Sequence, residues 1–239
     1  IIGAQGDDNI SVDVGDASGR DGVNGTYSTG TGNDSLGIGD FVDGFDGEDC
    51  HASNNDTLDC PENVWGDSTV TTGTGNDTVV IALHGEQTVD TGDGNDRVTI
   101  MGDTDDILTT ASGDGISTIS TGAGNDWVAT ESDFSNYVIT LGDGADTLSM
   151  TDCEGEDCAV GDVNVSAGTG NDWMDINVVD GYHTVDAGDG ADTLSIGCEC
   201  DEDLGELNIA MGAGDDDLFI SGISVNTGSD TDIDVDITL

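Results

Sequence analysis

The sequence contains almost no positive charge. Its 239 residues include 52 Asp and Glu but only two basic residues, Arg20 and Arg97, so the net charge is −50. Such a chain repels nucleic acid and anionic membranes, which argues against both as partners. It favours cations, because self-repulsion opposes compaction unless bound divalent ions or a very salty medium neutralise the charge.

Aromatic residues and long apolar runs are also scarce. Aromatic residues make up 4% of the chain, 38 residues are glycine, and Pro61 is the only proline. A thick globular core is therefore not expected, whereas a thin core of stacked Val, Ile and Leu is. No apolar run approaches the roughly 18 residues that predict a transmembrane helix. We expect a mature, exported chain from which any signal segment has been removed.

Catalytic signatures are missing from the sequence. The histidines His51, His84 and His183 are scattered, and there is no nucleophile elbow, phosphate loop or zinc motif. Some parallel β-helices degrade acidic polysaccharides, but that chemistry needs basic residues to hold the substrate. We therefore expect that the protein is not an enzyme.

The six cysteines lie in close pairs. In chain order these pairs are Cys50 and Cys60, Cys153 and Cys158, and Cys198 and Cys200. An even number at short spacing predicts three local disulfides and an oxidising, extracellular setting, either secreted or at the cell surface. The last pair is the least secure, because it closes a very small ring. Zinc binding is the weaker alternative, since zinc-type paired spacing is missing.

One short motif is abundant. Its copy at residues 91–100 reads Thr-Gly-Asp-Gly-Asn-Asp-Arg-Val-Thr-Ile. Copies recur at intervals of about 20 residues or more, and a period of this size predicts a solenoid. They occupy residues 3–8, 30–34, 73–77, 92–96, 122–126, 142–146, 168–172, 188–192 and 212–216.

Apolar and polar residues alternate on both sides of each motif. Val70 precedes one turn, and Val79 and Ile81 follow it with polar residues between them. Period-two alternation predicts strands with one buried face and one solvated face, and no segment has a helical stripe. Each repeat is therefore a strand, a Gly-rich turn, a second strand and a variable return. We expect one unit over residues 1–239, with insertions in returns near 39–66, 102–115, 151–161 and 197–205.

The composition of the turn favours a hard cation. Two glycines permit positive φ, and Asn tolerates the left-handed region. Stacked repeats bring the last Asp of each motif to about 4.8 Å from the next, where each pair repels by about 1 kcal/mol in water. Clustered carboxylate and carbonyl oxygens without nearby imidazole or thiolate are typical of calcium sites. The alternative is that these Asp residues only cap turns and solvate a halophilic surface.

The motif resembles the calcium-binding nonapeptide repeat of RTX (hemolysin-type) proteins, from residue 3 to about residue 220. The resemblance implies a parallel β-roll with several Ca²⁺ ions between neighbouring turns, each held by turn carbonyls and the motif Asp. This chain differs in its longer repeat, in lacking the family's first glycine in most copies, and in carrying the motif on only one of its two turns. We expect an all-β, right-handed parallel β-helix or β-roll solenoid of about ten coils, with calcium along one edge.

The resemblance also implies a set of metal ligands. The candidates are Asp8, Asp34, Asp77, Asp96, Asp126, Asp146, Asp172, Asp192 and Asp216. Some turns offer a second carboxylate, at Asp93, Asp143 and Asp189.

The chain ends predict a mode of assembly. Residues 10–14 and 233–239 alternate like strands without a polar cap, so each end is expected to be an open sheet edge. We expect a structural building block whose copies stack head to tail into an extracellular filament or surface layer. The alternatives are an adhesin or ice-binding module that uses a flat face against a cell surface or ice, and the calcium-folding secretion segment of a larger exported protein. Trp127 and Trp173 follow the motif Asp at outward-facing positions, where they offer a docking point.

Overall fold

Two parallel β-sheets of nine strands each make up the described part of the protein. The computed structural model describes residues 5–13, 24–39, 51–52, 58–59, 66–83, 85–101, 116–131, 136–151, 161–178, 181–198, 204–222 and 234–238. These residues form no helix, and so none that is long and apolar enough to span a membrane.

The two sheets take alternate strands from the chain. Sheet A consists of β2 (Gly25–Thr31), β6 (Ser68–Thr74), β8 (Gln87–Asp90), β10 (Ile116–Ser120), β12 (Asn136–Asp143), β14 (Val163–Thr169), β16 (Gly181–Asp186), β18 (Leu204–Ala210) and β20 (Asp234–Thr238). Sheet B consists of β1 (Asn9–Asp13), β3 (Ser35–Gly39), β7 (Thr78–Ala82), β9 (Arg97–Met101), β11 (Trp127–Glu131), β13 (Thr147–Thr151), β15 (Trp173–Val178), β17 (Thr193–Cys198) and β19 (Asp217–Ser221). A separate antiparallel pair joins β4 (His51–Ala52) and β5 (Leu58–Asp59).

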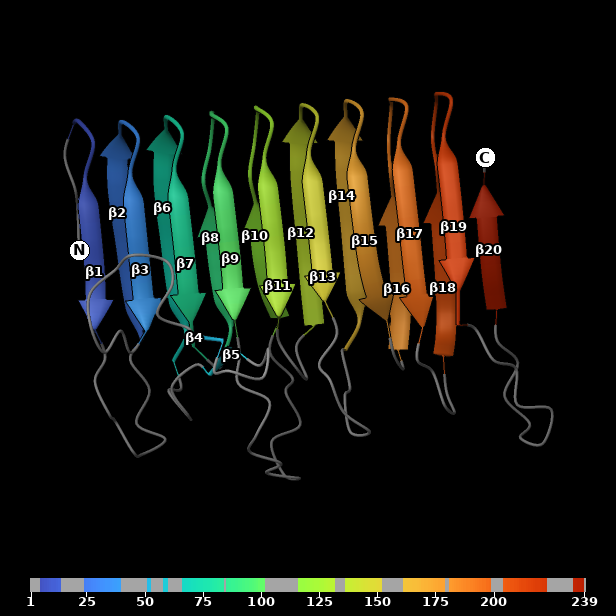
Figure 1. Ribbon diagram of the computed structural model, residues 1–239, viewed down its shortest axis with the longest axis horizontal. Coiled ribbons are helices and arrows are strands. Elements are labelled where there is room, and N and C mark those ends of the chain that lie inside the picture. The colour runs from blue at the N-terminus through green and yellow to red at the C-terminus, as the bar shows by residue number, and fades with distance from the viewer. Residues whose placement is uncertain are drawn as a thin grey trace.

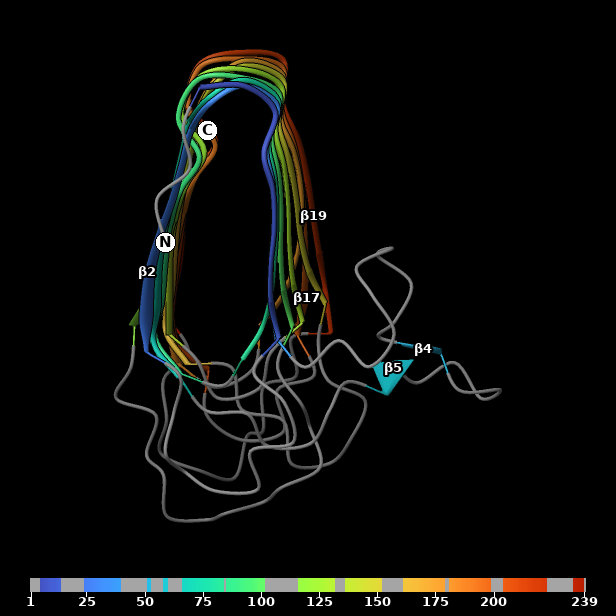
Figure 2. The same cartoon turned by 90° about the vertical axis from the view of Figure 1, so that its left-hand side faces the viewer.

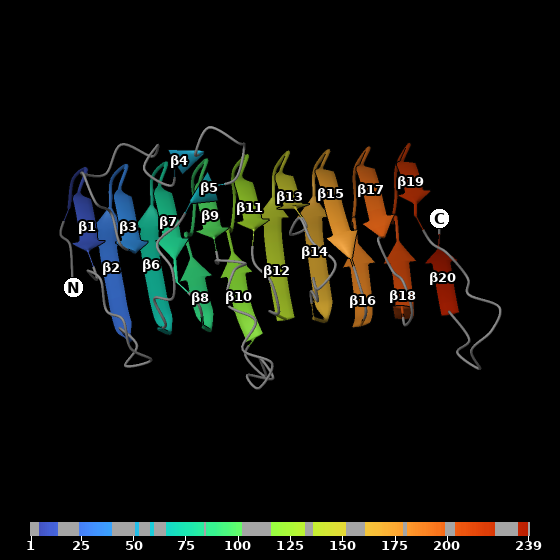
Figure 3. The same ribbon diagram turned by 60° about the horizontal axis from the view of Figure 1, so that its bottom comes forward.

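From the copy at residues 30–34 onward, each motif turn carries the chain from a strand of sheet A to a strand of sheet B. These turns all lie along the upper edge in Figure 1, and each new pair of strands is added beside the previous pair. Figure 2, a view along the row, shows the two sheets facing each other beneath the stacked turns. Figure 3 shows both sheets ending with β1 and β2 at one end and with β19 and β20 at the other. The prediction that the motif occupies one edge only is confirmed.

The apolar core lies between the two sheets. Val70 of β6, Val89 of β8 and Ile119 of β10 are in register in sheet A and are buried. In sheet B, Val79 and Ile81 of β7 are also fully buried. Each strand contributes alternate residues to this core, so it extends along the whole row with a thickness of one side chain from each sheet. The predicted period-two alternation is confirmed.

The predicted insertions and disulfides concern parts of the chain that are mostly outside the described residues. The insertions near 39–66, 102–115, 151–161 and 197–205 are described only where they adjoin strands and in the β4–β5 pair. Of the cysteines, only Cys198 falls within a described strand, where its backbone ends β17. The cysteine pairing therefore stays a prediction.

Candidate metal centre

Glycine allows the motif turns to stack closely. At Gly73 and Gly75 the backbone φ angles are +104° and +133°, a region that favours glycine. A Cβ atom at Gly73 would lie 1.8 Å from the carbonyl oxygen of Gly30, and one at Gly75 would lie 1.6 Å from that of Gly32. The same close approach recurs along the edge. Both glycines are therefore needed, because only a hydrogen atom fits against the carbonyl of the neighbouring turn.

The last Asp of each motif joins a continuous hydrogen-bonded row, which we call the aspartate file. The file consists of Asp8, Asp34, Asp77, Asp96, Asp126, Asp146, Asp172, Asp192 and Asp216. In each pair of neighbours, the backbone N–H of the earlier Asp donates to Oδ1 of the later Asp, with N···O distances of 2.7–3.0 Å. One oxygen of each carboxyl thus ties two neighbouring turns together. The predicted alignment of these residues is confirmed.

The second oxygen of most file carboxyls is buried without a hydrogen bond. This applies to Oδ2 of Asp34, Asp77, Asp96, Asp126, Asp146, Asp172 and Asp192. Each of these residues is only 1–2% exposed. An unpaired buried carboxylate oxygen costs free energy of desolvation, so native structures pair such a group with a counter-charge or neutralise it. A row of seven therefore indicates a partner, either a proton or a cation.

The environment of the file disfavours the ionised carboxylates. Burial, assisted by the charges of neighbouring Asp residues, raises the pKa of Asp96, Asp146 and Asp172 from 3.8 to about 6. Burial also raises the pKa of Asp126 and Asp192. The hydrogen bond from the preceding backbone N–H opposes this shift but does not cancel it. The file therefore has a high affinity for positive charge.

The predicted second carboxylates lie outside the file. Asp93, Asp143 and Asp189 are exposed, at the turn position between the two glycines. The Oδ1 atom of Asp143 accepts a hydrogen bond from the Thr169 hydroxyl at 2.9 Å. Asp143 and Asp189 act on the file electrostatically, because their charges help to raise the pKa of Asp146 and Asp192. They form an acidic rim outside the buried row.

The available donors are suited to a hard cation. Among the residues that the structure describes, no three His, Cys, Asp or Glu side chains converge in the manner of a metal site. An ion at this edge would therefore need backbone carbonyls beside the free Oδ2 atoms of the file. All of these donors are oxygen, and Ca²⁺ accepts six to eight oxygen ligands from mixtures of carboxylate, carbonyl and water. The seven buried file residues, from Asp34 to Asp192, fit such an ion through their unpaired Oδ2 atoms.

A second ladder, on the solvent side of the same turns, was not predicted. Where Asn precedes a file Asp, its Oδ1 accepts a hydrogen bond from the backbone N–H of the next turn. Asn95 accepts from Asn125 at 2.7 Å, and Asn125 accepts from Ala145 at 2.9 Å. These Asn residues are exposed, and their hydrogen bonds run in the direction opposite to those of the file. Asn therefore has a pairing role here, besides its tolerance of tight turns.

Buried threonines add a third set of links beneath the turns. The hydroxyls of Thr72, Thr91 and Thr121 donate to backbone carbonyls of the neighbouring strand at 2.8–3.3 Å. Later in the row, the position that corresponds to these threonines is occupied by apolar residues such as Leu141 and Ala167. One signal for this arrangement is present in the sequence: a Thr precedes the first glycine in the early copies.

Comparison with known proteins returned no relatives. No family model, curated protein or solved structure matches the chain. The function must therefore be inferred from the residues themselves.

Proposed function

We propose that this chain is an extracellular, calcium-binding structural protein, and that its two sheets are the walls of a right-handed parallel β-solenoid of about ten coils. Ca²⁺ ions lie along the motif edge, each with the free Oδ2 of a file Asp and turn carbonyls among its ligands. The row of buried, unpaired carboxylate oxygens supports this proposal. Bound calcium neutralises part of the −50 charge and allows the chain to fold.

A calcium titration tests this role. The chain, freed of metal in low-salt buffer, is followed by far-ultraviolet circular dichroism as Ca²⁺ or Mg²⁺ is added. Calcium is expected to produce the β-sheet signal cooperatively, whereas Mg²⁺, which demands strict octahedral geometry and keeps its water, is expected to be much less effective. Complete folding in chelator at low salt would contradict the proposal.

Head-to-tail stacking of copies is the second part of the proposal. Among the described residues, β19 and β20 pair on one side only, as do β1 and β2. Ile237 of β20 is 41% exposed although it is in register with the buried Ile209 of β18. An open parallel edge with an uncovered core residue can accept another strand, and another copy offers one of matching geometry.

Assembly is measured by light scattering and electron microscopy at rising protein concentration, with calcium and with chelator. Filaments are expected in calcium only. Ile237→Asn is expected to suppress them, because it places an amide at the joint. Val138→Asn is the matched control, since Val138 is 37% exposed on the outer face of sheet A, away from the joint. A calcium-loaded chain that stays monomeric at high concentration would count against assembly.

An ice-binding face is supported by one observation. Thr26, Thr69, Thr88 and Thr118 are in register on sheet A. The next two strands carry Val138 and Asn164 at this register position, so the threonine array covers only part of sheet A. Measurable thermal hysteresis would favour this function over a purely structural role.

A further inference from the structure

The outer face of sheet B between β7 and β17 carries few charges in a chain whose net charge is −50. The first and third residues of β7, β9, β11, β13, β15 and β17 point away from the core, and the structure describes all of them. Only Arg97 and Asp175 carry charge at these positions, with opposite signs. The others are mostly Thr, Ser and small apolar residues, interrupted by tryptophan. In β19, which lies next to β17, Asp217 adds one negative charge near Phe219. This face therefore differs from the acidic motif edge in both charge and chemistry.

Aromatic residues recur on this face at every second strand. They are Trp127 in β11, Trp173 in β15 and Phe219 in β19. Trp127 and Trp173 share one register position through Thr147 of the intervening strand. Two strand spacings separate them by about 9.6 Å along the row. Phe219 lies two residues further along its strand than the Trp173 position.

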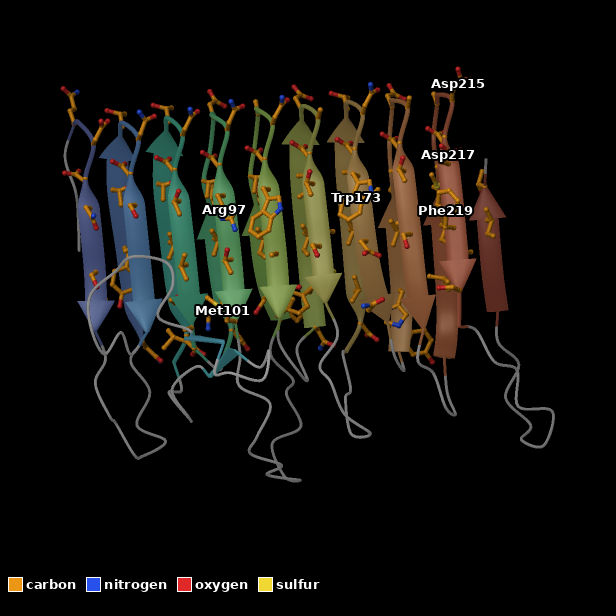
Figure 4. The ribbon with its side chains drawn as sticks, viewed as in Figure 1. Arg97, Met101, Trp173, Asp215, Asp217 and Phe219 are labelled. Atoms are coloured by element: carbon orange, nitrogen blue, oxygen red, sulfur yellow. The ribbon has the colours of Figure 1, made fainter. Side chains whose placement is uncertain are left out.

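Trp173 and Phe219 remain exposed, whereas Trp127 is partly covered. Trp173 is 43% exposed and Phe219 is 59% exposed. Figure 4 shows both of them, together with Arg97, on the outer face of sheet B. The Arg97 guanidinium lies 3.6 Å from the centroid of the Trp127 ring and holds this ring in place by a cation–π contact. The register neighbours of Trp173 are Thr147 and Thr193, which are too short to cover an indole ring.

We infer that this face binds a neutral, extended polysaccharide, with sugar rings stacked on Trp173 and its aromatic neighbours. A β-linked pyranose has a flat face of C–H groups that packs against an aromatic ring, and hydroxyl groups around its edge that pair with Ser and Thr. The distance between aromatic residues on alternate strands is close to the length of two sugar units in such a chain, so every second sugar would stack on an aromatic ring. The charge of the chain disfavours charged ligands on this face. Anionic glycans are repelled by the −50 charge, and a cationic partner is drawn to the acidic motif edge instead of this face.

The test is a set of binding measurements on the calcium-loaded, folded chain. Binding to neutral glycans is measured as depletion of the protein from solution by insoluble cellulose or chitin, and as retardation of the protein in gels that contain a soluble neutral β-glucan. Retardation in gels that contain polygalacturonate is the comparison. Trp173→Ala and Phe219→Ala are expected to weaken binding to at least one neutral glycan roughly tenfold each, because each removes a large apolar contact. Tyr182→Ala is the matched control, since Tyr182 is an aromatic residue 64% exposed on sheet A. Circular dichroism verifies that each variant is folded.

A second readout uses the wild-type chain alone. A soluble glycan bound at Trp173 is expected to quench or shift tryptophan fluorescence and to protect it from acrylamide. The inference is overturned if no neutral glycan is retained, if Trp173→Ala binds as the wild type does, or if Tyr182→Ala weakens binding equally. Stronger retention by polygalacturonate or by a cationic peptide at this face would also overturn it. The face lies on sheet B and not at the motif edge, so these outcomes are independent of whether calcium drives folding.

Discussion

Replacing one carboxylate in the middle of the aspartate file distinguishes calcium binding from simple turn capping. Asp146 is 1% exposed, its Oδ1 accepts the Asp126 N–H at 2.8 Å, and its Oδ2 has no hydrogen bond. Asp146→Asn keeps an acceptor for the Asp126 N–H but removes the charge. If Asp146 only caps the turn, the substitution should change stability by the same amount with and without calcium.

The magnitude follows from the burial of the carboxylate. Raising the pKa of Asp146 from 3.8 to about 6 corresponds to about 3 kcal/mol of destabilisation at neutral pH. The Asn amide adds buried donors without an acceptor, which costs about 1–3 kcal/mol. The calcium-free variant is therefore expected to be up to about 2 kcal/mol more stable than the wild type. With calcium this advantage should shrink by about 1.4 kcal/mol for each tenfold loss of ion affinity, so a loss of more than about thirtyfold makes the variant less stable than the wild type.

The assay is urea unfolding at neutral pH, followed by circular dichroism, with calcium and with chelator. Trimethylamine N-oxide, which strengthens burial, is present throughout to keep the calcium-free chain folded. Asp90→Asn is the control, because Asp90 is exposed on sheet A and the substitution makes the same change of charge. An Asp146→Asn variant that shifts stability equally in both buffers would refute the reasoning and favour the capping role.

Three further predictions concern pH and the turn itself. The pKa of three file carboxyls is about 6 in the folded chain and about 3.8 when unfolded, so the folded state holds more protons between these values. Stability of the calcium-free chain should therefore fall as pH rises across this window, and unfolding curves showing a rise there would contradict the pKa argument. Gly144→Ala places a Cβ 1.5 Å from the Gly124 carbonyl oxygen, at φ +147°, and should lower the free energy of unfolding by roughly 3–5 kcal/mol. Gly6→Ala is the control: at φ +117° but with no atom within 4 Å, it should cost roughly 1–2 kcal/mol. Thermal melts of the two variants measure both costs. Asn125→Gly and Asn125→Ala should each cost about 1 kcal/mol, because both lose the acceptor for the Ala145 N–H. Full tolerance of glycine in unfolding measurements would instead assign Asn125 a conformational role.

The sequence was sufficient to predict the sheets and the edge on which the motif lies. Alternation at residues such as Val79 and Ile81 follows directly from a strand with one buried face, and the two glycines mark where the chain must turn. The long, variable returns carry neither periodicity nor a repeated turn, so residue patterns define no structure for them.

The candidate site was predicted only in part, because several turn positions carry Asp. Asp93, Asp143 and Asp189 stay predicted second carboxylates, and a signal within the chain distinguishes them from the file. Other copies have Thr or Ala at that position, as at Thr74 and Ala123, whereas every copy ends in Asp. A position that tolerates Ala is not expected to hold an obligatory ligand. The Asn ladder was missed because it depends on an N–H in the next turn, some 20 or more residues away in the chain.

The arrangement of Asp and Asn within one turn is the strongest argument for a bound cation. Both residues accept a single backbone N–H from a neighbouring turn, and the amide oxygen of Asn does this without a charge. Solvation alone would favour the opposite placement, with Asn in the buried row and Asp in the exposed one. In the five turns with Asn33, Asn76, Asn95, Asn125 and Asn171, the chain instead buries the charged residue and exposes the neutral one, and leaves one oxygen of the buried carboxyl unused. A capping role explains Oδ1 but gives Oδ2 no function, whereas a hard cation shared along the edge accounts for both oxygens and for the burial.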